Sequence, residues 1–247
     1  MEINERVAAI SDIGKKRKNN EDAAYAAYSQ YGVLLVVADG MGGHRKGEVA
    51  SKYVVDELSI EFASNRRVFS TSSAKKFVLK CLKKSNKEIY KMSLAGEEYK
   101  EMGTTAVVAL VAKNGTYVIC LGDSRCYSFS KDTGLTKQTI DQTYVELLFE
   151  TGRINKAEMQ SHPQKNLLIN AVGINPDLSQ IQEKVIPNDS YDTLLLCSDG
   201  LYNLVSDEEI SRVLAASKTA DEKAKELVDL ALNHGGNDNI AVAIWEK

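Results

Sequence analysis

The sequence predicts an α+β fold in which antiparallel sheets pack together and helices cover their outer faces. Short β-rich runs recur along the chain, tight links join most of them, and two long helical patterns interrupt them. Links such as Lys113-Asn114-Gly115 and Asp132-Thr133-Gly134 contain residues that tolerate positive φ, which favours hairpins over a doubly wound parallel sheet. Helices grouped between runs of strands suggest a sandwich.

Seven runs rich in β-branched and apolar residues are expected to form strands. They are Val7 to Ile10, Val33 to Asp39, Thr105 to Ala112, Tyr117 to Leu121, Cys126 to Ser130, Thr193 to Ser198 and Ile240 to Trp245. Apolar residues fall on one helical face over residues 50–62 and again over residues 77–92. Two further helices near the end carry capping boxes, Ser206 with Glu209 and Thr219 with Glu222.

The composition indicates one domain spanning residues 1–247. The chain has 247 residues, 43% of them hydrophobic, and no Pro-rich or Ser/Gly-rich stretch separates two halves. The region Asp141 to Pro176 has helical pieces, Tyr144 to Glu150 and Lys156 to Gln160, but no clean strand. We interpret residues 141–176 as a lobe on the core.

Charge and hydropathy argue against several functions. The net charge is −3 and the basic residues are spread along the chain, which argues against nucleic-acid binding. The longest apolar runs are too short to cross a bilayer, and the first twelve residues lack an apolar signal-peptide core. The four cysteines form no Cys-x-x-Cys pair and are typical of small buried side chains in a reducing compartment. A cytoplasmic protein is expected.

Three aspartates stand where apolar strands begin or end, namely Asp39, Asp199 and Asp238. Strand ends at one sheet edge lie close together, and glycines after Asp39 and Asp199 let the backbone turn sharply toward a ligand. A single strand that ends in Asp-Gly is more often a plain turn than a metal site. The metal hypothesis therefore depends on the whole set of acids.

Glu21, Asp22 and Asp123 bring the number of carboxylates in short Gly-flanked or Asn-flanked segments to six. Clustered carboxylates repel one another unless protons or cations neutralise them. An all-oxygen set without matching His or Cys ligands selects hard ions such as Mg²⁺ or Mn²⁺. Two such ions could lower the pKa of a shared water and stabilise in-line attack on phosphorus.

Six segments of the sequence stand out in order, namely Ser11 to Asp22, Val37 to His44, Gly103-Thr104-Thr105, Gly122-Asp123-Ser124-Arg125, Cys197 to Leu201 and Asp238-Asn239-Ile240. In this order they resemble the motifs of the metal-dependent protein phosphatases, also called type 2C serine/threonine phosphatases. The resemblance spans almost the whole chain, and the Gly-Met-Gly-Gly-His loop is similar to that of bacterial stand-alone members. It implies a four-layer α-β-β-α sandwich, two packed antiparallel sheets flanked by helix pairs.

The resemblance also implies a set of metal ligands. Asp39 would bridge two Mn²⁺ or Mg²⁺ ions, with the Gly40 carbonyl as a further ligand. Glu21 and Asp199 would complete the shells, and Asp238 would hold the ion that it shares with Asp199.

Four other residues receive roles by the same resemblance. Asp22 would act through water behind the ligands, and Asp123 would hold a third, weaker metal. Arg17 would bind the substrate phosphate with its paired donors, although a basic run such as residues 15–18 is usually a solvated face. His44 could protonate the leaving oxygen or be an ordinary surface-loop histidine. Asp141-Gln142-Thr143 replaces the Asp-His-Ser of relatives, which puts contacts of the lobe in doubt.

These features predict a serine/threonine protein phosphatase that hydrolyses phosphoserine and phosphothreonine with a metal-activated bridging water. Phosphorylated proteins would be its substrates, and a bacterial Ser/Thr kinase its opposing partner. No Cys-x5-Arg loop of a cysteine-based phosphatase is present. Two alternatives stay open, a non-catalytic metal-binding signalling module on the same fold and a metal-dependent hydrolase of other substrates.

Overall fold

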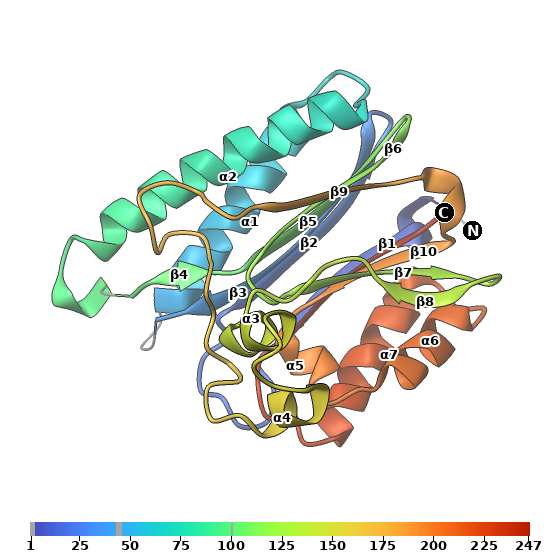
Figure 1. The fold of residues 1–247 in the computed structure, drawn as a ribbon. Helices are drawn as coiled ribbons and strands as arrows, with labels where there is room; N and C mark the ends of the chain where they lie inside the picture. The colour runs from blue at the N-terminus through green and yellow to red at the C-terminus, as the bar shows by residue number, and fades with distance from the viewer. Residues whose placement is uncertain (1–2, 43–45, 100) are drawn as a thin grey trace.

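Two antiparallel sheets lie face to face at the centre of the computed structural model, which describes residues 3–42, 46–99 and 101–247 (Figure 1). The strands are β1 (Val7–Asp12), β2 (Asp22–Ser29), β3 (Gly32–Met41), β4 (Gly103–Thr104), β5 (Ala106–Ala112), β6 (Gly115–Leu121), β7 (Arg125–Ser130), β8 (Gly134–Lys137), β9 (Gln182–Ile186), β10 (Thr193–Cys197) and β11 (Ile240–Glu246). One sheet has the order β1-β11-β10-β7-β8, and the other has the order β2-β3-β5-β6-β9 with β4 paired to β3.

Helices cover the outer face of each sheet. The α-helices are α1 (Lys46–Ser64), α2 (Thr71–Ser93), α3 (Tyr144–Glu150), α4 (Lys156–Ser161), α5 (Asp199–Tyr202), α6 (Asp207–Ala215) and α7 (Ala220–Asn233), with short 3-10 helices at Ile3–Arg6, Glu97–Tyr99 and Asn188–Ser190. Helices α1 and α2 pack on the sheet that contains β3, and α6 and α7 pack on the sheet that contains β11 (Figure 1). The predicted four-layer sandwich is therefore confirmed.

Strand β3 shows why the two sheets stack. Successive side chains of a strand point to opposite faces of the sheet. Leu34 and Val36 belong to the core under α1 and α2, whereas Leu35 and Val37 belong to the core between the two sheets. Because both faces are buried, the run is apolar without the usual polar alternation.

The helix ends follow local sequence signals. Ser206 and Thr219 cap α6 and α7 as predicted, and each accepts a hydrogen bond from the backbone N–H three residues later while Glu209 or Glu222 reaches back to the cap. Helix α2 places buried residues such as Ala74, Val78 and Cys81 along one face. Among the described residues, no helix combines the length and apolar character needed to span a bilayer.

Four strands of the structure are not among those that the sequence pattern predicts. The run Asp22–Ser29 contains four alanines and forms β2 all the same. Alanine is depleted in strands. The whole run nevertheless pairs antiparallel with β3, from Asp22 opposite Asp39 to Ser29 opposite Gly32, and this pairing stabilises the strand despite its low propensity. The other three, β4, β8 and β9, are short, and β8 and β9 are also largely exposed or only partly buried.

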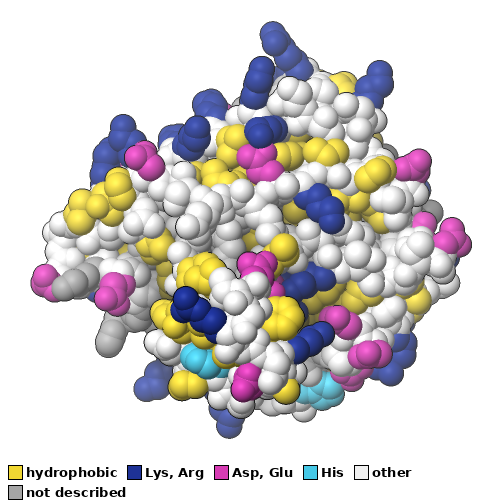
Figure 2. All heavy atoms as spheres, viewed as in Figure 1, with side chains coloured by type: hydrophobic (Ala, Val, Ile, Leu, Met, Phe, Trp, Pro, Cys, Tyr) yellow, Lys and Arg dark blue, Asp and Glu magenta, His cyan; other side chains and the backbone are white. Residues whose placement is uncertain are grey.

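Residues 141–176, which the sequence predicts to form a lobe, contain α3 and α4 and no regular strand. A bridge between Thr104 and Val172 joins its last part to β4. Figure 2 shows hydrophobic side chains at the surface where α3 lies in Figure 1. Leu147 and Phe149 of this helix are exposed.

Replacing Leu35 by alanine tests the packing between the sheets. Its side chain is fully buried there, so Leu35→Ala should lower the free energy of unfolding by about 2–5 kcal/mol. Val185→Ala is the matched control, because this residue of the same sheet is 53% exposed and should cost about 0.5 kcal/mol or less. Urea unfolding followed by circular dichroism measures both, and equal losses would contradict the packing described here.

Candidate active site

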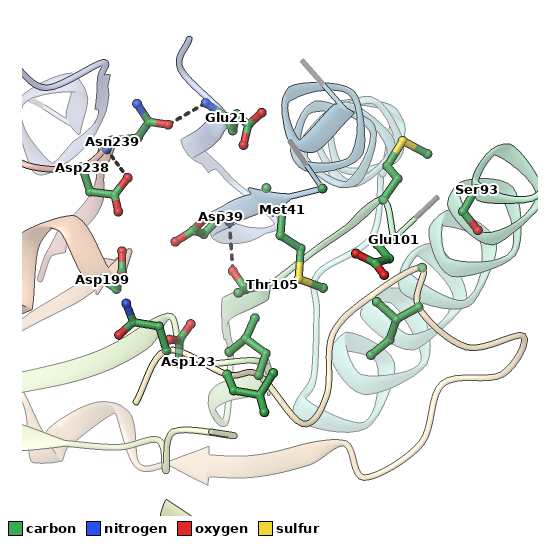
Figure 3. A pocket seen from close by; sticks show the side chains of 18 of the residues that line it. Glu21, Asp39, Met41, Ser93, Glu101, Thr105, Asp123, Asp199, Asp238 and Asn239 are labelled. Atoms are coloured by element: carbon green, nitrogen blue, oxygen red, sulfur yellow. Dashed lines mark hydrogen bonds between the residues drawn. The ribbon is translucent and has the colours of Figure 1, made fainter. Parts of the chain in front are cut away.

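A cavity of about 720 Å³ opens at one end of the sandwich, and its walls differ in chemistry. Asp199 and Asp238 lie at one end, whereas Met41, Ser93 and Glu101 lie on the far side of Asp39 from them, so the second end combines apolar side chains with a hydroxyl and one exposed acid (Figure 3). The predicted site residues on its wall are Arg17, Glu21, Asp39, Gly40, Asp123, Asp199 and Asp238.

The acids come from both sheets, so the expectation that strand ends of one sheet edge supply them is wrong. Asp39 lies inside β3 of one sheet, while Asp199 follows β10 and Asp238 precedes β11 in the other. Alternation places Asp39 on the same face of β3 as Leu35 and Val37, the face that looks toward the second sheet. The cavity thus lies where the apolar core between the sheets gives way to carboxylates.

Hydrogen bonds from neighbouring strands fix the position of Asp39. Its backbone N–H donates to Thr105 Oγ1 at 2.9 Å, and the Thr105 N–H donates back to the Asp39 carbonyl at 2.8 Å. The Thr105 hydroxyl lies 2.6 Å from that of Ser124, which follows Asp123. Thr105 and Ser124 therefore connect the segments that carry two of the acids.

Asp22 lies behind the cavity wall rather than in it. It is 8% exposed, and its Oδ2 accepts a hydrogen bond of 2.6 Å from the Ser198 hydroxyl. That hydroxyl in turn accepts from the backbone N–H of Ala241 at 2.8 Å. Asp22 thus joins β2 to the ends of β10 and β11 at the base of the site.

Asn239 positions the loop that carries Glu21. Its Oδ1 accepts from the Glu21 N–H at 2.9 Å, and its Nδ2 donates to the carbonyls of Ile13 and Asn19 at 2.8 and 2.9 Å. The Glu21 carbonyl accepts from Gly40 N–H at 3.0 Å. A Cβ on Gly40 would lie 2.1 Å from the carbonyl oxygen of Gly47, so only glycine fits there.

Sequence reasoning gave no role to four residues that hold the acids in place. They are Thr105, Ser124, Ser198 and Asn239. All four stand inside the motifs that carry the family resemblance, so the sequence singles out their segments. Their individual roles depend on contacts across the sheets, which no sequence spacing reveals.

Asp123 is anchored through the backbone. The Tyr202 hydroxyl donates to the Asp123 carbonyl at 3.1 Å, and the Arg125 guanidinium stacks on the Tyr202 ring at 3.4 Å from its centre. Arg125 also forms a two-pronged ion pair with Asp141, at 3.0 and 2.6 Å. These contacts join the Asp123 loop, the helix that begins at Asp199 and the start of the lobe.

Gln142, the departure from the family pattern, serves as a connector. Its Oε1 accepts from the Gly122 N–H at 2.9 Å and from Asn170 Nδ2 at 3.0 Å, and its Nε2 donates to the Gln180 carbonyl at 2.6 Å. The amide therefore ties the lobe to the segment that precedes Asp123.

Arg17 is half exposed at the cavity mouth, where its Nη2 donates to Asp238 Oδ2 at 2.7 Å. A guanidinium has five N–H donors, so one contact to a carboxylate leaves others that can bind a phosphate. The proposed general acid His44 lies outside the described residues.

Burial raises the pKa values of four of the acids, and mutual repulsion adds to the effect. The pKa of Asp22 is raised to about 8, that of Asp123 to about 7 and that of Asp199 to about 6. Burial and the charges of Asp22 and Asp199 likewise raise the pKa of Asp39 well above its usual range. The site thus binds either protons or cations near neutral pH.

Within the described ranges, no three His, Cys, Asp or Glu side chains form a ready-made metal ligand set. The acids surround open cavity space instead. Mg²⁺ usually keeps several waters and binds one or two carboxylates directly, so a spaced set of buried oxygens fits hydrated hard ions. The oxygen-only donors and the raised pKa values of Asp39, Asp123 and Asp199 both fit such a group.

The sequence profile of the protein phosphatase 2C family matches residues 14–232. The chain belongs to this family.

Within this family, the chain is similar to bacterial proteins named serine/threonine phosphatases. The serine/threonine phosphatase stp of Listeria innocua serovar 6a is 35% identical over 238 residues, which cover 96% of this chain and 94% of the relative. The crystal structure of the serine/threonine phosphatase Stp1 from Staphylococcus aureus has a TM-score of 0.89 at 35% identity, covering 98% of this chain and 94% of Stp1. The catalytic domain of the serine/threonine protein phosphatase PstP, in complex with 2 manganese ions, has a TM-score of 0.81 at 34% identity, covering 98% and 97%.

Without divalent cations, stability should fall as pH rises. Folded-state pKa values of about 8, 7 and 6 for Asp22, Asp123 and Asp199 lie above the unfolded value of about 4. The folded state therefore binds more protons between about pH 4 and pH 8, so its advantage is complete below this window and is lost as pH rises through it. Thermal unfolding in EDTA at pH 5, 6.5 and 8 should show a decreasing Tm.

Cations compete with these protons, so the increase in Tm caused by Mn²⁺ should be larger at pH 8 than at pH 5. A Tm in EDTA that rises steadily from pH 5 to pH 8 would contradict the clustering of buried acids.

Proposed function

We propose that this chain is a serine/threonine protein phosphatase that hydrolyses phosphoserine and phosphothreonine in proteins. One observation carries the proposal, the convergence of five carboxylates from two sheets with Arg17 on one cavity. Such a site can hold cations and accept a dianionic phosphate. The relatives described above are named serine/threonine phosphatases.

Two Mn²⁺ or Mg²⁺ ions are the proposed cofactors. Asp39, the Gly40 carbonyl, Glu21, Asp199 and Asp238 would hold them, and the PstP catalytic domain in complex with 2 manganese ions supports this number. When bound, such ions lower the pKa of water and stabilise charge on phosphoryl oxygens.

Two more acids complete the proposed assignment. Asp123 lines the same cavity and would hold a third, weaker ion. Asp22 would act through water from behind the wall, where the Ser198 hydroxyl donates a hydrogen bond to it.

The chain itself positions and neutralises the reactants. Arg17 would bind two oxygens of the substrate phosphate, since a guanidinium offers paired N–H donors. Asn203 Nδ2 donates to Asp199 Oδ2 at 3.1 Å, and the Thr105 hydroxyl holds the backbone of Asp39. These contacts prearrange the acids, so little reorganisation is needed when charge develops.

A cysteine nucleophile has no support in this structure. Cys81, Cys120, Cys126 and Cys197 are all buried, and burial raises the pKa of each thiol, to about 12 for Cys81 and Cys126. Thiolates are the nucleophilic form, so water is the better source of the attacking oxygen and no covalent phosphoenzyme is required.

The non-catalytic alternative would need a defective site. A signalling module on this fold would lack one or more of the acids, whereas Glu21, Asp39, Asp199 and Asp238 all line the cavity. Hydrolysis of other phosphoesters remains the second candidate, and comparing phosphopeptides with small phosphoesters separates the two.

The setting of the enzyme is also proposed. We assign residues 1–247 to one catalytic domain with the lobe at 141–176, working in the cytoplasm, where four unpaired cysteines stay reduced. A Ser/Thr kinase of a bacterial cell is the proposed opposing partner, and phosphorylated proteins rather than nucleic acids are the substrates.

Purified protein should hydrolyse a phosphothreonine peptide in Mn²⁺ and stop when EDTA is added. Asp199→Asn should lower kcat/KM by at least about a hundredfold, because losing a metal ligand costs several kcal/mol of transition-state stabilisation. Asp229→Asn, an exposed acid on α7, is the matched control and should keep full activity. Hydrolysis that persists in EDTA would contradict the metal mechanism.

Arg17→Ala should raise KM for the same peptide by about tenfold or more, since a hydrogen bond to a charged group contributes about 1.5–3 kcal/mol. A smaller change in kcat would show that the contact forms already in the bound substrate. Lys18→Ala removes a neighbouring exposed positive charge that is not on the cavity wall. If both substitutions raise KM equally, general attraction rather than a specific phosphate contact is responsible.

A further inference from the structure

The end of the cavity away from Asp199 and Asp238 has, besides Ser93 and Glu101, a group of apolar side chains that phosphate chemistry does not require. Its walls are the C-terminal end of α2, the tip of β3 and two segments of the lobe. The apolar arm, as we call it, is lined by Met41, Tyr90, Leu94, Leu167, Leu168 and Ile174.

The floor of the arm is built by close backbone approach. Met41 pairs with Gly103 of β4, and a Cβ on Gly103 would lie 2.9 Å from both Met41 Cε and Ile174 Cγ2. The missing side chain therefore leaves room for these two methyl groups to share one surface. Gly173 packs as tightly on α2, because its Cβ would lie 2.1 Å from Ile89 Cγ2.

The arm is continuous with the carboxylate end. Asp39 and Met41 both line the cavity, and as residues i and i+2 of β3 they share one face of the sheet. Their Cα atoms are therefore about 7 Å apart along the strand. Figure 3 shows Met41 on the side of Asp39 that faces Glu101 and Ser93.

An extended peptide has the same spacing. Side chains two residues apart point the same way and lie about 7 Å apart. A phosphorylated residue over Asp39 would thus bring the side chain two positions away, in one chain direction or the other, to Met41 and Ile174. The cavity volume of about 720 Å³ is in the range of sites that enclose more than one small group.

We propose that the apolar arm binds an apolar side chain of the substrate, two residues from the phosphorylated residue, and that Met41, Leu94 and Ile174 set this preference. The inference rests on the proposed phosphatase function and names the class of peptide that the site selects. Glu101, an exposed residue on the same arm, adds repulsion against an acidic side chain there.

Phosphothreonine peptides that carry Leu, Ala or Asp at position −2 or +2 test the proposal. In Mn²⁺, kcat/KM for Leu over Ala should be about tenfold at one of the two positions, the usual scale for a few buried methylene groups. Asp should be the poorest residue at that position. The ratio is taken within each enzyme preparation, so differences in metal loading cancel.

Two variants with a matched control locate the effect. Ile174→Ser should bring the Leu-to-Ala ratio close to one, and Leu94→Ser should lower it about two- to threefold, in proportion to the smaller contact of an exposed wall residue. Leu94 is 69% exposed, so its substitution should not prevent folding, and Ile60→Ser removes an apolar side chain that is 67% exposed on α1. The ratio of Ile60→Ser should equal that of the wild type.

The outcomes distinguish the inference from the proposed function. Hydrolysis of all peptides without a preference for Leu at −2 or +2, or a preference that all three variants keep, would overturn the arm alone. Failure to hydrolyse any phosphopeptide while p-nitrophenyl phosphate is hydrolysed, or failure with both, would overturn the proposed function and the inference with it.

Discussion

Repulsion between buried carboxylates is the constraint on which this structure depends. Asp22 and Asp123 are buried and Asp39 and Asp199 are partly buried, and each has a raised pKa because burial and the neighbouring negative charges disfavour its ionised form. A fold gains nothing from such a cluster unless protons or cations neutralise it. Apolar side chains buried on the faces of the two sheets stabilise the fold that holds the acids together.

The two sheets also explain how the site stays in register. Asp39 extends the inner face of one sheet, while Asp199 and Asp238 flank adjacent strands of the other. Ser198 and Thr105 then bridge segments that are far apart in sequence. The face of β3 that packs Leu35 and Val37 between the sheets also carries Asp39. Packing between the sheets therefore fixes the position of this acid in the cavity.

Much of the architecture can be predicted from the sequence, because apolar periodicity and capping boxes report local structure directly. Strand β3 and helices α6 and α7 are examples. Strand β2 cannot be predicted in this way, because its alanines have low strand propensity and form a strand by pairing with β3. Asp-Gly and Asp-Asn steps at the ends of apolar runs identify three of the acids in the sequence. Their origin in two sheets and the apolar arm beside them depend on tertiary contacts. The approach of Met41 and Ile174 over Gly103 leaves no pattern in the sequence.

The pairing of β1 with β11 brings residues 7–12 beside residues 240–246. Contacts between such distant segments form slowly, because the entropy cost of closing a long loop comes before the contacts stabilise the fold. Residues 7–12 are synthesised long before residues 240–246, so β1 has no partner strand at this edge during most of synthesis. Asp238 directly precedes β11, so the acidic centre is assembled only after residues 238–246 have been synthesised.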